Sequence, residues 1–137
     1  HSQLLARHQA RLPENKSGSR VVFHDPCYLG RYRNIYDAPR EVIARSAEVI
    51  EPHRARQRSF CCGAGGGLAF LGEEKGKRVS VERAEELTAT GAEVVGAACP
   101  FCNTMFRDAL AAISPSPPRL LDIAQIAAAS IRQDSQG

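Results

Sequence analysis

Short hydrophobic runs alternate along this 137-residue chain with longer stretches whose apolar residues recur three or four positions apart. A β-branched or aromatic run favours a buried strand, and the longer spacing favours an amphipathic helix. The pattern predicts strands at 20–24, 49–50, 93–98 and 120–121, helices at 3–12, 37–48, 77–90 and 123–132, and a helix from Cys102 or Asn103 to about Ile113. Such alternation predicts a three-layer, Rossmann-like α/β fold, with a small parallel sheet of about four strands and helices on both faces.

Several predicted helices carry recognisable end signals. Asp37 is suited to cap the helix that it begins, and Asp122 is expected to cap the last one. Gly91 follows the helix predicted at 77–90, in the position where helices often end on a glycine. The segment 53–58 reads as an exposed loop, and the apolar patch at 68–71 has no clear assignment.

The composition is that of one ordinary globular domain. Hydrophobic residues make up 43% of the chain and charged residues 24%, which excludes collagenous, disordered and membrane-spanning classes. No apolar run approaches the roughly 20 residues that a spanning helix needs. We expect an N-terminal helix and linker at 1–19, a cysteine-rich domain at 20–132 and a tail at 133–137.

The basic residues are scattered over the chain, whose formal net charge is +3. Arg54, Arg56 and Arg58 form a local cluster, but no block of lysines and arginines is interleaved with aromatic residues. We interpret this surface as solvated or facing a protein partner, and we expect no nucleic-acid ligand and no direct insertion into a membrane.

Five cysteines carry the chemistry that the sequence suggests. Cys27 is followed after 33 residues by the adjacent pair Cys61 and Cys62, and after a further 36 residues by Cys99 and Cys102. An odd number of thiols in a chain of this size argues against a disulfide framework and favours a reducing, cytoplasmic location.

The surroundings of the cysteines predict that they meet. Adjacent thiols diverge in regular structure, so Cys61 and Cys62 require an irregular loop. The glycines Gly63, Gly65, Gly66 and Gly67 supply one that lets the backbone approach a bound group. Cys27 and Cys99 each follow a predicted strand, at the sheet edge where ligands of parallel α/β folds gather.

Four interpretations of the thiols are open on residue types alone. Cys99 and Cys102 before a helix are typical of a thioredoxin-like redox pair, which leaves three cysteines unused. A closed zinc site takes four ligands, fewer than this chain offers. The glycine loop departs from the phosphate-binding pattern, and buried cysteines acting as small hydrophobes would not fall in pairs at strand ends. An iron–sulfur cluster uses all five thiols.

Three motifs resemble those of a known family, namely His24-Asp25-Pro26-Cys27, Cys61-Cys62-Gly63-Ala64-Gly65-Gly66 and Cys99-Pro100-Phe101-Cys102. They resemble the cysteine-rich CCG domain that occurs in the B subunit of heterodisulfide reductase, in the C subunit of anaerobic glycerol-3-phosphate dehydrogenase and in lactate-utilisation iron–sulfur proteins. The stretches at 28–32 and 36–40 are most similar to the C-terminal part of larger iron–sulfur oxidoreductases that resemble electron-transfer-flavoprotein dehydrogenases. The resemblance covers about residues 20–130.

The resemblance implies a [4Fe-4S] cluster, noncubane in the relatives, bound by Cys27, Cys61, Cys62, Cys99 and Cys102, with Gly63, Gly65 and Gly66 shaping the cofactor site. In an isolated fragment made in air, the cluster is expected to be absent or replaced by zinc. His24 is a candidate for a hydrogen bond near the cluster or simply a polar residue at the end of a strand. Arg31 and Arg33 face an anionic partner or belong to a solvated loop.

The function expected from the resemblance is electron transfer within a larger oxidoreductase. The implied partners are a second CCG domain and a ferredoxin-type domain of the parent chain, together with electron-transfer flavoprotein or another redox protein. The implied location is the cytoplasm, including the cytoplasmic face of the membrane. Two alternatives are a catalytic heterodisulfide or thiol–disulfide reductase site and a zinc-stabilised interaction domain.

Overall fold

A parallel sheet of four strands forms the centre of the protein in a computed structural model, which describes residues 1–8, 12, 14, 18–71 and 76–134. The elements in chain order are α1 (Ser2–Arg7), β1 (Arg20–Phe23), α2 (Asp37–Ala44), β2 (Glu48–Ile50), the 3-10 turns η2 (Arg56–Arg58) and η3 (Gly65–Gly67), α3 (Leu68–Leu71), α4 (Val79–Thr88), β3 (Val94–Ala97), α5 (Pro100–Ile113), β4 (Arg119–Asp122) and α6 (Ile123–Asp134).

The strands lie in the order β2-β1-β3-β4, and every neighbouring pair is parallel. Val21 of β1 aligns with Val49 on one side and with Val94 on the other. The two central strands are largely buried, whereas β2 and β4 are partly exposed edges. The parallel α/β fold predicted from the alternating pattern is therefore confirmed.

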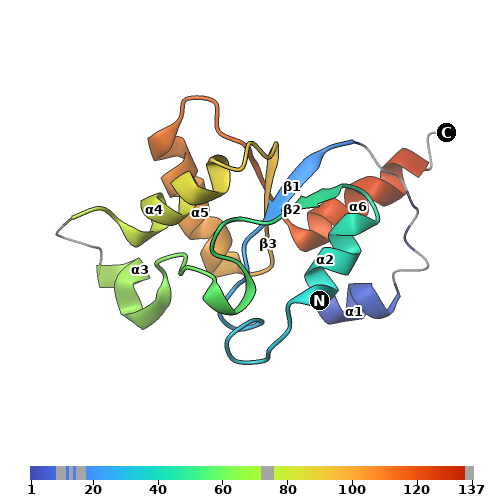
Figure 1. Ribbon diagram of the computed structural model, residues 1–137, viewed down its shortest axis with the longest axis horizontal. Coiled ribbons are helices and arrows are strands. Elements are labelled where there is room, and N and C mark those ends of the chain that lie inside the picture. Colours follow the sequence, from blue (N-terminus) through green and yellow to red (C-terminus); the bar gives the residue numbers. More distant parts are fainter. Residues whose placement is uncertain (9–11, 13, 15–17, 72–75, 135–137) are drawn as a thin grey trace.

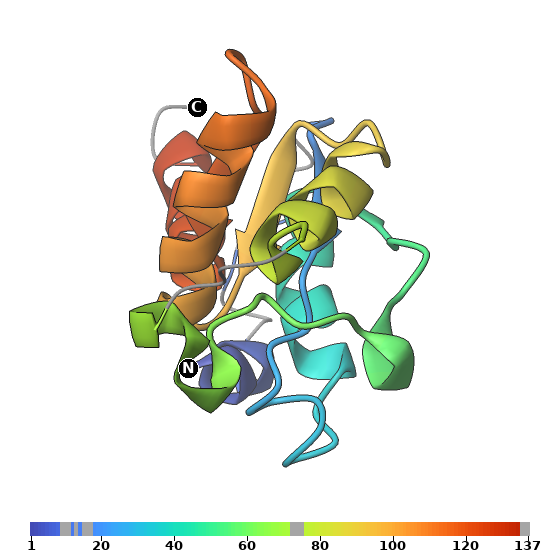
Figure 2. The same ribbon diagram turned by 90° about the vertical axis from the view of Figure 1, so that its left-hand side faces the viewer.

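Helices cover both faces of the sheet, which gives the three predicted layers (Figures 1 and 2). On one face α4 and α5 pack against Val22 and Val95. On the other face α2 and α6 pack against Val21 and Phe23, and α1 lies against α2. Because successive side chains of a strand point to opposite faces, β1 contributes to both cores.

Two predicted end signals are confirmed. Gly91 lies just beyond α4 with φ +69, the left-handed conformation that favours glycine there. The Asp122 carboxylate accepts a hydrogen bond of 2.8 Å from the backbone N–H of Ala124 and so caps α6.

Other boundaries differ from the prediction. The helix expected at 37–48 ends at Ala44, because the chain turns there and enters β2 at Glu48. Asp37 is not the cap of α2, since Tyr36 holds that position and the Asp37 carboxylate accepts a hydrogen bond from Arg56 instead. The helix expected at 3–12 ends at Arg7, and residues 9–11 lie outside the described part.

The remaining differences concern loops near the cysteines. The expected exposed loop at 53–58 contains the turn η2 and a half-buried Arg54. The unassigned patch at 68–71 is the short helix α3, in which Phe70 and Leu71 are exposed. α5 begins at Pro100, so Cys102 lies inside its first turn. None of the helices in the described residues is long and apolar enough to cross a bilayer.

Candidate metal centre

The five cysteines come from three segments that end at the carboxyl edge of the sheet. Cys27 lies in the turn after β1, Cys61 and Cys62 lie in the loop before η3, and Cys99 follows β3. Cys99 is the N-cap of α5 and Cys102 lies in its first turn, because Pro100 is well suited to the first helical position. All five thiols are free.

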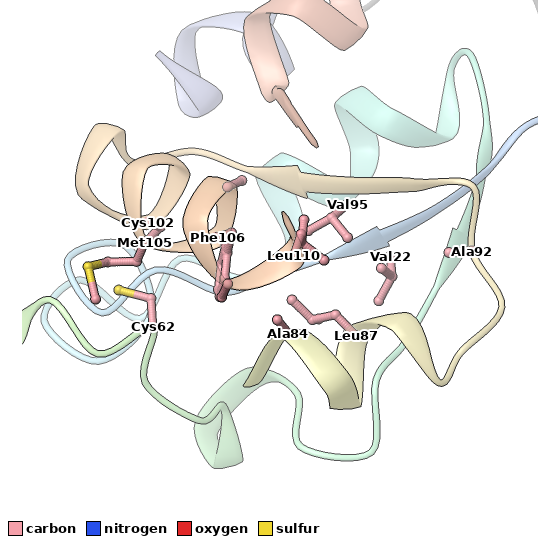
Figure 3. Close-up of a cluster of buried hydrophobic side chains, with 12 residues drawn as sticks. Val22, Cys62, Ala84, Leu87, Ala92, Val95, Cys102, Met105, Phe106 and Leu110 are labelled. Carbon is pink, nitrogen blue, oxygen red and sulfur yellow. The ribbon is translucent and has the colours of Figure 1, made fainter. Parts of the chain in front are cut away.

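Two thiols and one imidazole form the buried centre of the site. The ligand atoms of His24, Cys62 and Cys102 lie within 4.8 Å of one another, and all three residues are buried. Cys62 and Cys102 close one end of the hydrophobic cluster beneath α4 and α5, next to Met105 (Figure 3). A metal bound there would be shielded from water on its inner side by apolar side chains.

The other three cysteines surround this centre. Cys99 is hydrogen-bonded to the Cys102 thiol. Cys27 and Cys61 line a small pocket of about 40 Å³ together with Cys62. The Cys61 sulfur is exposed and accepts a hydrogen bond of 3.3 Å from the backbone N–H of Gly63. The structure thus brings all five predicted residues to one edge; which of them bind a metal stays a prediction.

The thiols do not ionise alike. A hydrogen bond with Cys102 lowers the pKa of Cys62 to about 4, although burial opposes this shift. The same partner lowers the pKa of Cys99 to about 6. The pKa of Cys102 is raised in turn, because its proton is shared with Cys62 and then with Cys99. Burial, followed by the charges of Cys62 and Cys61, raises the pKa of Cys27.

The glycine loop is shaped at particular positions. Gly63 has φ +89, and a Cβ atom there would lie 3.1 Å from the backbone nitrogen of Ser80 at the start of α4. Gly66 also has positive φ, at +64, but has open space around it. Gly65 has neither a positive φ nor a neighbour within 4 Å. The role of these glycines in binding a cofactor stays a prediction.

His24 reaches the thiols because the alternation of β1 continues one residue beyond the strand. Its side chain enters the layer of α4 and α5, and its ring packs edge-on against Phe106 at 4.7 Å between centroids. Burial lowers the pKa of His24, although a hydrogen bond with Cys62 opposes the shift. The imidazole of His24 has a second hydrogen-bond partner, Arg83 of α4, whose Nε lies 3.2 Å from Nδ1 of His24.

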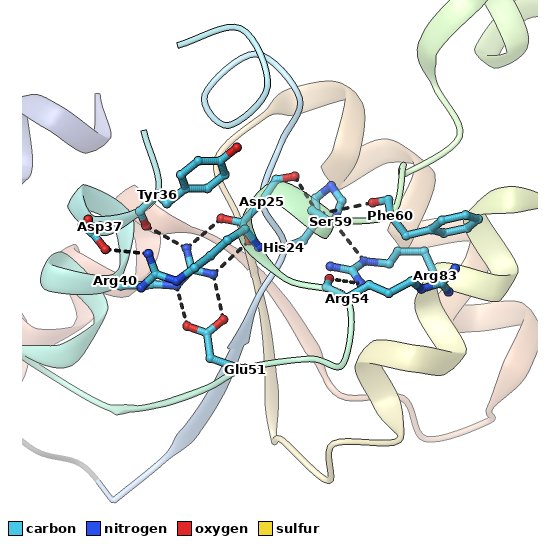
Figure 4. A network of polar contacts seen from close by, with 11 residues as sticks. His24, Asp25, Tyr36, Asp37, Arg40, Glu51, Arg54, Ser59, Phe60 and Arg83 are labelled. Carbon is cyan, nitrogen blue, oxygen red and sulfur yellow. Dashed lines mark hydrogen bonds and ion pairs between the residues drawn. The ribbon is translucent and has the colours of Figure 1, made fainter. Parts of the chain in front are cut away.

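A second polar network lies on the opposite face (Figure 4). Arg40 of α2 donates to both carboxylate oxygens of Asp25, at 2.7 and 2.9 Å, and also to Glu51 and the carbonyl of Tyr36. Neither Arg40 nor Arg83 was predicted to belong to the site. A charged residue in line with Ala84 and Leu87 on the buried stripe of a helix was the signal for Arg83.

The arginines predicted to face a partner are partly used within the chain. Arg31 donates a hydrogen bond of 2.7 Å to the carbonyl of Ser59, and so ties the segment after Cys27 to the loop before Cys61. The Arg54 guanidinium lies 3.8 Å above the Phe60 ring and pairs with Glu82 and Glu86. A contact of Arg31 or Arg33 with an anionic partner stays a prediction.

The donor set fits a sulfur-bound metal centre. Thiolates are the ligands that iron–sulfur clusters and zinc prefer, and two of them are buried side by side. Cys99 occupies the N-cap position of the 14-residue helix α5, whose first amides favour negative charge at this point. Because the pKa values of Cys62 and Cys99 are lowered, a cation bound by these two thiols would not first have to displace a tightly held proton.

A family model and several known proteins match this chain. The family model of the cysteine-rich domain CCG matches residues 21–107. The probable iron–sulfur-binding oxidoreductase FadF of Bacillus subtilis is 39% identical over 113 residues, which are 79% of this chain and 16% of that protein. The EtfAB:quinone oxidoreductase of Syntrophomonas wolfei is 37% identical over 123 residues, which are 83% of this chain and 17% of that protein.

A third relative is less similar to this chain. The D subunit of the dihydromethanophenazine:CoB–CoM heterodisulfide reductase of Methanosarcina mazei is 34% identical over 97 residues, which are 69% of this chain and 24% of that protein. The chain therefore spans about a sixth to a quarter of the length of these three relatives.

Proposed function

The chain belongs to the CCG family of cysteine-rich domains, and from this premise we propose that it is the cluster-binding, electron-transfer module of a larger iron–sulfur oxidoreductase. The observation that carries the proposal is the meeting of five thiols from three segments at one edge of the sheet. The names of the relatives support it, since one is described as iron–sulfur-binding and two as redox enzymes.

The proposed cofactor is one [4Fe-4S] cluster, with Cys27, Cys61, Cys62, Cys99 and Cys102 as its ligands. Five thiolates exceed what a cubane cluster or a closed zinc site uses, which favours the noncubane form. When bound, the cluster would supply an electron carrier.

The residues around the thiols have separate tasks in this proposal. Cys62 and Cys102 hold the inner side of the centre, where Met105 and Phe106 exclude water. The amides at the start of α5 offset part of the negative charge that thiolates bring. Gly63 and Gly66 let the loop after Cys62 turn back towards α4, and Gly65 belongs to the same loop.

The proposed partners rest on the family resemblance and are supported by the partial match. The chain covers only 16% of FadF and 17% of the EtfAB:quinone oxidoreductase, and we propose a second CCG domain and a ferredoxin-type domain in the parent protein. Electron-transfer flavoprotein is the proposed redox partner, and the cytoplasm or its membrane face the proposed location. Five free thiols are consistent with a reducing compartment.

Anaerobic reconstitution of the chain with iron and sulfide tests the proposal. Iron and acid-labile sulfide are expected at about four atoms each per chain, with an EPR signal in one of the two redox states. Binding of zinc alone, with no sulfide retained, would instead support the zinc-stabilised interaction domain. Reduction of a heterodisulfide by the complete parent protein would support the catalytic alternative. The name of the Methanosarcina mazei relative, a heterodisulfide reductase subunit, favours this alternative.

A further inference from the structure

His24 and Arg83 form a buried pair beside the innermost thiols, and the proposed function leaves this pair without a role. His24 is 1% exposed and Arg83 is fully buried. The Nε of Arg83 lies 3.2 Å from Nδ1 of His24 (Figure 4). His24 also belongs to the group of three residues whose ligand atoms lie within 4.8 Å, so by distance alone it is a candidate metal ligand.

The direction of the hydrogen bond decides the state of the imidazole. A guanidinium carries donors and no acceptor, so Nδ1 of His24 must accept and holds no proton. The single proton of the ring therefore sits on Nε2. Because Nδ1 is occupied by Arg83, Nε2 is the nitrogen that is available for the hydrogen bond between His24 and Cys62.

This tautomer is the wrong one for a ligand. A histidine binds a metal through an unprotonated nitrogen and donates the N–H of its other nitrogen to an acceptor. Coordination through Nε2 would move the proton to Nδ1, where it would face the N–H of Arg83. Two donors pointing at each other in a buried site cost a hydrogen bond and leave both groups unsatisfied.

Hydrogen bonds and an ion pair prevent the Arg83 side chain from rotating away from His24. Its Nη1 donates to the carbonyl of Arg54 at 2.9 Å and pairs with Glu86 at 2.9 Å. Its Nη2 is buried and has no hydrogen-bond partner among the residues that the structure describes. The guanidinium is thus held at Nη1 by two acceptors while Nε is directed at His24.

We propose that Arg83 is a positioning residue that fixes His24 as a hydrogen-bond donor to Cys62 and keeps the imidazole out of the metal-ligand set. The centre then takes its metal or cluster through sulfur alone. The inference rests on the proposed function, since it concerns metal binding by the same thiols. In this proposal the Arg83 guanidinium determines whether the site binds metal through sulfur only or through both histidine and cysteine.

The first test needs no metal. Long-range ¹H–¹⁵N correlation spectra of the reduced, metal-free protein report which nitrogen of His24 carries the proton. The Nε2–H tautomer is expected near neutral pH; a proton on Nδ1 would overturn the proposal. Because no cluster is involved, this result is independent of whether the chain binds iron and sulfide.

The second test uses ¹¹³Cd²⁺ added at one equivalent. In the wild-type protein no coupling between cadmium and the ring nitrogens of His24 is expected. In Arg83→Met the ring is free to change its tautomer, so coupling should appear and the affinity for cadmium should rise by about tenfold, the value of one charged hydrogen bond. Coupling in the wild type, or an unchanged spectrum and affinity in Arg83→Met, contradicts the proposal.

Arg54→Met is the matched control. Arg54 bonds to the same Glu86 but does not contact His24, so this variant should bind cadmium as the wild type does. Arg83→Met leaves Glu86 paired with Arg54 at 2.8 Å, so no carboxylate loses its last partner. Should Arg83→Met still fail to fold, the tautomer and the cadmium spectrum of the wild type decide the question.

Discussion

The two faces of the sheet begin from the same local geometry and end in different chemistry. After β1, His24 points to the face covered by α4 and α5, and Asp25 points to the face covered by α2. Each meets a buried arginine, Arg83 on the first face and Arg40 on the second. Neighbouring residues of one strand end are therefore the start of two separate polar networks.

The two arginines differ in how fully their charge is neutralised. Arg40 contacts the carboxylates of Asp25 and Glu51, and although burial opposes it, these bonds raise the pKa of Arg40 above its ordinary value. Arg83 has the neutral imidazole of His24 and one carboxylate, which it shares with Arg54, and burial lowers the pKa of Arg83. Arg40 is thus bound by two carboxylates, whereas Arg83 shares a single carboxylate with Arg54 and has the imidazole of His24 as its other side-chain partner.

The largest expected effect separates the faces by function. Cys62→Ser should abolish iron and sulfide incorporation, because it removes the buried thiolate at the middle of the site. The helix content should be preserved, and the free energy of unfolding of the metal-free protein should change by at most about 1 kcal/mol. Iron and sulfide analysis, circular dichroism and urea unfolding measure the three quantities. Full cluster occupancy in this variant would remove Cys62 from the ligand set.

On the α2 face we expect a loss of stability in the metal-free protein, the quantity that Cys62→Ser leaves almost unchanged. Asp25→Asn leaves Arg40 buried with only the partly exposed Glu51 as a carboxylate partner, which should cost about 3 kcal/mol of unfolding free energy in the metal-free protein. Asp37→Asn is the control, because its pair with Arg56 is exposed and should contribute less than about 1 kcal/mol. Equal losses in the two variants would show that burial of the Arg40 network does not matter.

The sequence sufficed for the layers of the fold because their signals are local. Hydrophobic runs fix the strands, helical spacing fixes the helices, and both put Cys27 and Cys99 at one edge. The turn after Ala44 was missed because residues 45–48 continue a helical pattern, and their conformation is decided by the pairing of β2 with β1. Tertiary pairing outweighs local propensity there.

The polar part of the site was harder to predict for a different reason. Arg83 and His24 are 59 positions apart, and Arg40 and Asp25 are 15 apart. Burial of a charged side chain is stable only with a partner, and that partner comes from another element. The pattern could therefore indicate that Arg83 faces the core, but not that its nitrogen would meet His24 rather than a carboxylate.

A third prediction compares glycines within the loop on the thiol face. Gly63→Ala combines a left-handed backbone with a Cβ 3.1 Å from the nitrogen of Ser80, and should cost about 2 kcal/mol of unfolding free energy. Gly66→Ala has the backbone cost alone and should lose about 1 kcal/mol. Gly65→Ala has neither feature and should be close to neutral. Urea unfolding of the metal-free variants measures the series, and equal losses at Gly63 and Gly66 would mean that the loop moves away from α4 without cost.

The smallest expected effect distinguishes two half-buried thiols of the site by their pH dependence. The pKa of Cys99 is lowered to about 6 by hydrogen bonding to Cys102, whereas burial raises the pKa of Cys27. A thiolate reacts and a thiol does not, so alkylation of Cys99 in the metal-free protein should level off above about pH 7, while that of Cys27 should still be rising at pH 9. At pH 7 Cys99 should react about tenfold faster, since the lower nucleophilicity of a low-pKa thiolate offsets part of its greater abundance.

Peptide mapping after short pulses of iodoacetamide measures the two rates separately, and the same pulses in concentrated urea are the control. Unfolding removes the hydrogen bond to Cys102 and the burial of Cys27, so the two rates should then share one pH dependence near the ordinary thiol value of about 8.5. Similar profiles for the two thiols in the folded protein would mean that Cys102 does not hold the proton between Cys62 and Cys99. The thiol face would then lack the internal proton sharing that sets it apart from the carboxylate-paired α2 face.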